Sequence, residues 1–188
     1  TRMDGDVGRV FAKLKEMGVA ERTIVFFTSD NGPHKEGGAD PAFFNSSGPL
    51  QGYKRSLHDG GIRVPMIARW PGKVRAGSVS DHPWYFADFL PTACELAGAE
   101  PPARCDGISL QPVLRGETAR QPRHEYLFWA YGQKRAVRMG DWKAVRNGRE
   151  SAIELYDLSQ DVGEQRNVAD RHPDRAAQAR QIMEEAEK

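Results

Sequence analysis

Ile24-Val25-Phe26-Phe27-Thr28-Ser29-Asp30-Asn31-Gly32 is the stretch that decides the fold. Its first five residues are β-branched or aromatic, which is typical of a strand buried on both faces of a parallel sheet. In open α/β sheets, ligands bind in the crevice beyond the carboxyl ends of such strands. The polar residues 29–32 therefore lie where binding residues are expected.

Helical and strand patterns alternate on both sides of this stretch. Upstream, apolar residues recur every three or four positions, as on one face of a helix: Val7, Val10, Phe11, Leu14 and Met17. Downstream, the apolar run 64–70 predicts a second buried strand, and residues 86–97 predict a helix that ends at Gly98. The alternation predicts an α/β fold with a mostly parallel central sheet.

The pattern changes after Pro101-Pro102. Short apolar segments predict a small antiparallel sheet with strands near residues 126–130, 135–139, 142–145 and 155–158. A polar helix is predicted after Pro173. We therefore expect two domains, an α/β part over residues 1–120 and a small α+β subdomain over residues 121–188.

Composition excludes several classes of protein. The 188 residues are 39% hydrophobic and 28% charged, which is typical of a globular chain. The 27 basic and 26 acidic residues leave a net charge of +1, so we expect no nucleic-acid partner. No apolar run reaches the roughly 18 residues that predict a membrane span. Cys94 and Cys105 have neither zinc-site nor disulfide-framework spacing.

Asp30 and Asn31 carry adjacent carboxylate and carboxamide oxygens. Such oxygens suit a hard cation, Ca²⁺ or Mg²⁺, better than zinc. Asp-Asn-Gly is also ordinary turn chemistry, because Asn and Gly tolerate left-handed backbone. The tetrapeptide alone leaves both interpretations open.

A second block, Gly52-Tyr53-Lys54-Arg55-Ser56-Leu57-His58-Asp59-Gly60-Gly61-Ile62-Arg63-Val64-Pro65, adds a specific signal. Together with Thr28-Ser29-Asp30-Asn31-Gly32 it resembles the sulfatase family, of the arylsulfatase type, in the alkaline phosphatase superfamily. Further segments match the same family in order: Asp88-Phe89-Leu90-Pro91-Thr92, Ala97-Gly98, Asp106-Gly107-Ile108-Ser109-Leu110, Gly140-Asp141-Trp142-Lys143 and Glu154-Leu155-Tyr156-Asp157-Leu158. The resemblance covers nearly the whole chain.

The resemblance implies a sulfuric ester hydrolase of the sulfatase fold. It implies that Asp30 and Asn31 are ligands of a divalent cation, usually calcium, and that Lys54 contacts the substrate sulfate. His34 either donates a proton, lines the substrate pocket or is a plain loop histidine. The implied partner is a sulfate ester, with a sulfated glycan as one candidate, and the implied location is periplasmic or secreted.

Other residues of the second block are expected to be structural. Gly60-Gly61 suits a close approach of backbone, and Asp59 with Arg63 is expected to form a local ion pair. His58 occupies a position where the family often has an aromatic residue, so we expect it to pack in the core or at its rim.

The chain departs from the family in one respect. Sulfatases use a formylglycine made from Cys or Ser within Cys/Ser-x-Pro/Ala-x-Arg, and no such segment occurs here. We therefore expect a C-terminal fragment that is inactive alone, with the formylglycine and the remaining metal ligands in a missing N-terminal part.

Two alternatives remain open at this point. Phosphodiesterases and phosphonate hydrolases of the same superfamily share the fold, but they tend to carry Asp-His where this chain carries Asp30-Asn31. The chain could also be a non-catalytic carbohydrate-binding remnant. The sequence does not decide the sulfate ester cleaved, exo or endo action, or the oligomeric state.

Overall fold

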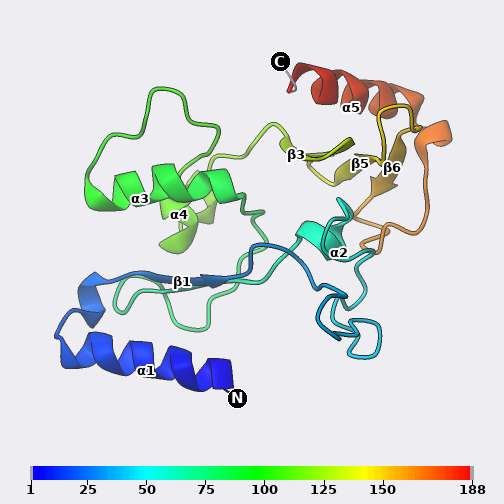
Figure 1. Cartoon of the computed structure of the whole chain (residues 1–188). Helices are drawn as coiled ribbons and strands as arrows, with labels where there is room; N and C mark the ends of the chain where they lie inside the picture. Colours follow the sequence, from blue (N-terminus) through cyan, green and yellow to red (C-terminus); the bar gives the residue numbers. More distant parts are fainter. Residues whose placement is uncertain (1, 187–188) are drawn as a thin grey trace. The chain divides into compact units, whose positions relative to one another are not determined.

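The computed structural model describes residues 2–186. The chain divides into two compact units (Figure 1). Unit 1 comprises Thr1–Thr28 and Met66–Arg123, and unit 2 comprises Ser29–Pro65 and His124–Lys188. By these contacts the segment 29–65 belongs with the C-terminal part of the chain. The domain boundary expected at residue 120 stays a prediction.

Unit 1 contains the first predicted helix and both predicted strands. Helix α1 (Arg2–Glu16) leads through the short helix η1 (Ala20–Arg22) to β1 (Val25–Thr28), which pairs with β2 (Met66–Arg69). Figure 1 shows α1 running beside this strand pair. The guanidinium carbon of Arg69 lies 4.7 Å from the ring centre of Phe11 on α1, so a cation–π contact joins helix and strand.

The mixed α/β class is confirmed, but the direction of one strand pair is a correction. We expected mostly parallel strands, whereas β1 and β2 pair antiparallel, with Val25 opposite Arg69 and Thr28 opposite Met66. Parallel neighbours need a crossover connection, usually a long helix. Residues 29–65 contain only the four-residue helix α2 (Asp59–Ile62). An antiparallel strand is common at the edge of an otherwise parallel sheet.

The rest of unit 1 consists of short helices. They are η2 (Phe86–Asp88), α3 (Phe89–Ala97), α4 (Gln111–Leu114) and η3 (Thr118–Arg120). Helix α3 ends at Gly98, as predicted, in the left-handed conformation with φ 70°. The buried Asp88 carboxylate accepts hydrogen bonds from the backbone amides of Tyr85 and Ile108, which fastens α3 to the segment that follows it.

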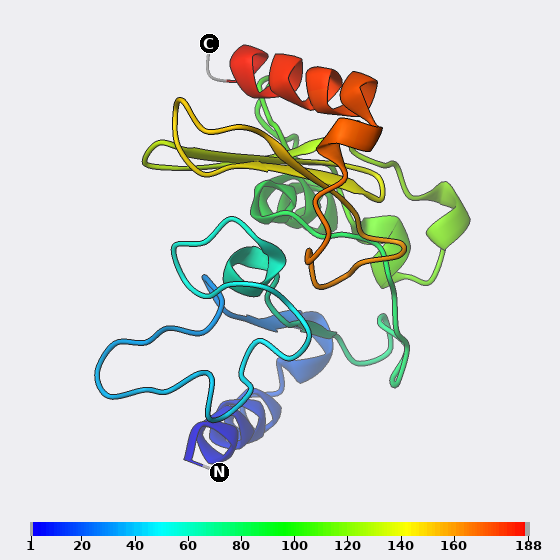
Figure 2. The same cartoon turned by 90° about the vertical axis from the view of Figure 1, so that its right-hand side faces the viewer.

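Unit 2 is built on the predicted antiparallel sheet. Its strands β3 (Leu127–Tyr131), β4 (Lys134–Met139), β5 (Trp142–Arg146) and β6 (Glu154–Asp157) pair in sequence order. After the short helix η4 (Ala169–Arg171), helix α5 (Pro173–Glu185) covers one face of this sheet (Figure 2). Both the sheet and the terminal helix are therefore confirmed.

The two faces of this sheet carry different cores because side chains alternate along a strand. The face toward α5 buries apolar residues of strands and helix: Val137, Met139, Ala144, Ile153, Leu155, Ala179 and Met183. The opposite face buries Ala136, Val145 and Tyr156 together with Leu57. Leu57 lies in the second sequence block, so this block packs against the sheet.

Among the helices of residues 2–186, none combines the length and the apolar character that a membrane span requires.

Candidate active site

The loop after β1 is closed by its own hydrogen bonds. The Ser29 hydroxyl donates to the carbonyl of Asn31 at 2.9 Å. The Asn31 side-chain amide donates to the carbonyl of Gly32 at 2.8 Å. This bond uses the NH₂ group of Asn31, so its Oδ1 atom can still accept a bond or bind a cation. Asp30 is exposed. These two oxygens fit the hard cation that the sequence predicts.

Two oxygens alone would not complete a metal site. Calcium takes about six to eight oxygen ligands. Within residues 2–186, no group of three or more His, Cys, Asp and Glu side chains gathers around a possible ion position. The assignment of Asp30 and Asn31 as metal ligands therefore stays a prediction.

Three glycines pack this loop against the second sequence block. The Gly32 amide donates to the Gly61 carbonyl at 2.9 Å, and the Gly60 amide donates to the Gln51 carbonyl at 2.8 Å. A methyl group added at Gly32 would collide with the Gly60 carbonyl, and one at Gly61 with the Ser56 carbonyl. The expected close approach of backbone at Gly60-Gly61 is confirmed.

Lys54 and His34 open onto the same hollow. The Lys54 amide donates to the Pro33 carbonyl at 2.7 Å, which joins the second block to the segment after Gly32. The hollow has a volume of about 440 Å³ and is lined by residues 34–36, 52–56 and Lys134. The structure therefore brings His34 and Lys54 together, whereas Asp30 and Asn31 do not line this hollow.

Both side chains contact Glu36, Lys54 through the carboxylate and His34 through the backbone amide. Lys54 Nζ lies 3.7 Å from Glu36 Oε2, and its side chain is 35% exposed, so it remains accessible to a ligand. His34 Nδ1 accepts a hydrogen bond from the Glu36 amide at 3.1 Å. That bond makes Nδ1 the acceptor and places the proton of a neutral His34 ring on Nε2.

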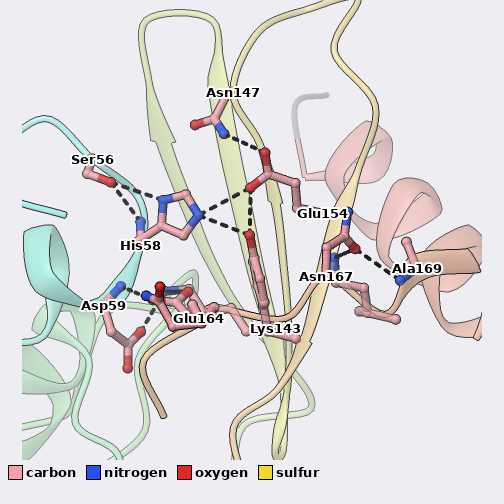
Figure 3. Close-up of polar contacts among 12 residues, drawn as sticks. Ser56, His58, Asp59, Lys143, Asn147, Glu154, Glu164, Asn167 and Ala169 are labelled. Carbon is pink, nitrogen blue, oxygen red and sulfur yellow. Dashed lines mark hydrogen bonds and ion pairs between the residues drawn. The ribbon is translucent and has the colours of Figure 1, made fainter. Parts of the chain in front are cut away.

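A buried ion group lies beneath the second block (Figure 3). The Lys143 side chain on β5 is completely buried, with Nζ 2.5 Å from Asp59 Oδ1 and 2.9 Å from Glu164 Oε1. The Asp59 amide donates to Glu164 Oε2 at 2.6 Å. Arg63 lies 3.6 Å from Asp59 Oδ2, so the predicted Asp59–Arg63 ion pair is confirmed as the outer part of this group.

Sequence reasoning missed Lys143 and Glu164 as partners of Asp59. A signal for Lys143 existed, because it shares a strand face with the buried Val145. A lysine at such an inward position needs an acidic partner. Nothing in the sequence pattern indicates Glu164. Burial raises the pKa of the Glu164 carboxyl, and the Lys143 ammonium opposes that rise without cancelling it.

His58 is buried in a second polar network on the same face of the sheet (Figure 3). Its Nδ1 lies 3.2 Å from the Ser56 hydroxyl and its Nε2 lies 3.2 Å from Glu154 Oε2. The Tyr156 hydroxyl donates to Glu154 Oε2 at 2.8 Å, and burial with this bond raises the pKa of Tyr156. The expected core packing of His58 is confirmed, and the network ties Ser56, at the hollow, to β6.

Replacing Gly32 by alanine is predicted to destabilise the chain by about 1–3 kcal/mol, because the added methyl group meets backbone that cannot move aside. The matched control is Gly8→Ala on α1, where a methyl group meets nothing within 4 Å. That change should stabilise the chain by about 0.5–1 kcal/mol. Urea unfolding measures both, and a Gly32→Ala chain as stable as the unmodified one would contradict the close packing.

Lys143→Met is predicted to remove about 3–5 kcal/mol of stability near pH 8, because two buried carboxylates lose their ammonium. The loss should shrink toward pH 5. A carboxyl group whose folded pKa is raised stabilises the fold below its unfolded pKa and loses that contribution as pH rises through the folded pKa. Without Lys143 the pKa of Glu164 rises further, so protonation relieves the burial cost at low pH.

Urea unfolding of the Lys143→Met chain at the two pH values tests this reasoning. Adding Glu164→Gln should restore part of the stability near pH 8, since the second change removes one unpaired charge. A loss that is the same at both pH values would show that packing, and not charge, accounts for the effect.

Two family models match the chain. The model described as "Sulfatase" matches residues 1–99. The model described as "N-sulphoglucosamine sulphohydrolase, C-terminal" matches residues 52–188. The matched ranges overlap across the second block and together span the whole chain.

Curated relatives are also sulfatases. The chain is 42% identical over 148 residues to the steryl-sulfatase of Mus musculus, covering 76% of this chain and 24% of that protein. It is 33% identical over 217 aligned residues to arylsulfatase A of Bos taurus, covering 98% of this chain and 41% of that protein. The chain thus spans 24% and 41% of the lengths of these two relatives.

Solved structures share the fold of this chain. The protein Ps i-CgsB, in complex with k-i-k-neocarrahexaose, matches with a TM-score of 0.80 and 29% identity over 97% of this chain and 40% of that one. A protein in complex with its substrate D-glucosamine-2-N,6-O-disulfate matches with a TM-score of 0.74 and 26% identity over 97% and 37%.

Phosphonate monoester hydrolase of Agrobacterium radiobacter matches less closely, with a TM-score of 0.63 and 27% identity over 88% of this chain and 34% of that one. The order of the sequence blocks, the fold and both family models agree. The chain belongs to the sulfatase family.

Proposed function

We propose that the protein containing this chain is a sulfuric ester hydrolase and that the chain supplies part of its metal and sulfate site. The observation that carries this proposal is the hydrogen bond from the Lys54 amide to the Pro33 carbonyl. It joins the second sequence block to the segment that follows the Asp30-Asn31 loop. As a result, Lys54 and His34 share one hollow.

Each side chain then has a distinct role. The Lys54 ammonium binds a sulfate oxygen and stabilises the negative charge that grows during ester cleavage. His34, with its proton on Nε2, donates to the leaving oxygen or orients the substrate in the hollow. Asp30 and Asn31 would hold a divalent cation, calcium, which polarises sulfate oxygens when bound. None of these 188 residues is proposed as the nucleophile, since no Cys or Ser among them stands in the formylglycine pattern.

The substrate is proposed to be a sulfated saccharide, in a periplasmic or secreted setting. The solved neighbour with a disulfated glucosamine supports this class of substrate. The phosphonate alternative is less favoured, because its structural match is weaker and Asn31 replaces the histidine expected there.

Lys54→Ala, in the protein as its gene encodes it, is predicted to lower turnover of an aryl sulfate by about 100-fold, because one charge-stabilising donor is lost. The melting temperature should change little, since the Lys54 side chain is 35% exposed and its ion pair with Glu36 spans 3.7 Å. Lys15→Ala on α1 is the matched control and should leave turnover unaffected. Equal turnover in the Lys54→Ala and Lys15→Ala proteins would refute the role of Lys54.

The 188-residue chain alone is predicted neither to hydrolyse an aryl sulfate nor to bind calcium tightly. Asp30 and Asn31 supply two of the about six to eight oxygens that calcium needs. Incubation with an aryl sulfate and calorimetric titration with calcium check both statements. Turnover above the buffer rate, or micromolar calcium binding that Asp30→Ala removes, would disprove this prediction and reveal a complete site within the chain.

A further inference from the structure

The hollow beside Lys54 carries more positive charge than one sulfate requires. Its lining contains five basic side chains: His34, Lys35, Lys54, Arg55 and Lys134. Glu36 is the carboxylate in the lining. Its two oxygens are divided between Arg55 Nη2, at 2.6 Å, and Lys54 Nζ, at 3.7 Å. One carboxylate therefore serves two of the cations.

The ammonium groups of Lys35 and Lys134, which line the hollow, are not neutralised by a carboxylate of residues 2–186. Lys35 Nζ lies 4.7 Å from the centre of the Tyr53 ring, and Lys134 Nζ donates to the Arg55 carbonyl at 2.9 Å. Neither lysine forms an ion pair with any carboxylate of residues 2–186. An ammonium group has three donors, so each retains donors for a ligand.

Arg55 is held in an unusual backbone conformation. Its φ is 75°, in the left-handed region that non-glycine residues seldom adopt. Such strain persists where surrounding structure fixes it, and it concentrates at binding and catalytic sites. Here the Lys134 ammonium fixes the Arg55 carbonyl, while Glu36 fixes the guanidinium. The strained turn presents Arg55 beside Lys134 on the wall of the hollow.

We propose that Lys35, Arg55 and Lys134 form a subsite for a second anionic group, carried by the same saccharide whose sulfate Lys54 binds. The inference rests on the proposed function and adds a substrate class to it, a saccharide with two anionic groups. A hollow of about 440 Å³ is within the usual range for small-molecule sites. A second sulfate and a carboxylate share the chemistry that this wall recognises.

Glu36 gives the subsite its selectivity. Its carboxylate repels an entering anion and competes for the Arg55 guanidinium. A ligand with one anionic group gains little by displacing this competitor, whereas a second anionic group gains the contacts of Lys35 and Lys134 as well. Glu36→Gln should therefore tighten binding of every anionic ligand and reduce the advantage of the second group.

Calorimetric titration of the 188-residue chain tests the subsite without requiring turnover. The probes are glucosamine 6-sulfate, with one anionic group, and glucosamine 2-N,6-O-disulfate and glucuronic acid 2-sulfate, with two. We expect at least one doubly anionic probe to bind about tenfold more tightly than glucosamine 6-sulfate at low salt, and the ratio to fall as salt rises. The probe that shows the advantage identifies the second group as sulfate or carboxylate.

Two variants test whether the tighter binding of doubly anionic probes depends on Arg55 and Lys134. Lys134→Gln and Arg55→Gly should each bring the ratio of affinities toward one, whereas the control Lys15→Gln should retain it. Arg55→Gly also relieves the strained φ, so its melting temperature should equal or exceed that of the unmodified chain. Loss of the ratio without loss of stability separates binding from misfolding.

The outcomes separate this inference from the proposed function. Equal affinities for all three probes, or an advantage that survives both wall variants, would overturn the subsite. An advantage that survives in Lys54→Ala, with glucosamine 6-sulfate binding unchanged, would instead remove Lys54 from the sulfate site and with it the proposed function.

Discussion

The buried ammonium of Lys143 is the contact on which the geometry of unit 2 depends. It joins β5 to Asp59, the first residue of α2, and to Glu164 in the segment after β6. Burying three charges is costly, and the cost is offset only while all partners stay in place. The group therefore fixes where α2 begins. Gly60 and Gly61 follow directly, and they set the distance at which the Asp30-Asn31 loop can pack.

The residues proposed for metal binding and those proposed for sulfate binding are joined through residues 32 and 33. The side-chain amide of Asn31 donates a hydrogen bond to the Gly32 carbonyl. The carbonyl of the next residue, Pro33, accepts a hydrogen bond from the backbone amide of Lys54. Asp30 and Asn31 remain outside the hollow that Lys54 and His34 line. Residues 32 and 33 thus connect the residues proposed for a cation with those proposed for the sulfate, and a site that polarises and holds one sulfate group would need both sets.

Local patterns in the sequence predicted the elements, and long-range charge pairing escaped them. The four strands of unit 2 are short apolar segments, so a small antiparallel sheet near these residues was readable. The family pattern indicated Lys54 as a sulfate contact but left His34 open between a proton donor, a pocket residue and a plain loop histidine. The antiparallel pairing of β1 with β2 was not predicted, because strand direction depends on the course of the connecting segment. Lys143 and Asp59 are 84 positions apart, and no periodicity links residues at that separation.

The glycine contacts also bear on how such a chain changes through evolution. A hydrogen bond from the Gly32 amide to the Gly61 carbonyl joins the two blocks, so it holds the ends of the segment between them close together. Most of residues 35–48 are exposed, and loop closure becomes only slightly more costly as a loop grows. Insertions and deletions there can reshape the rim of the hollow without moving the loop that carries Asp30. Changes to the rim of the hollow and preservation of the Asp30 loop are thereby separated along the sequence.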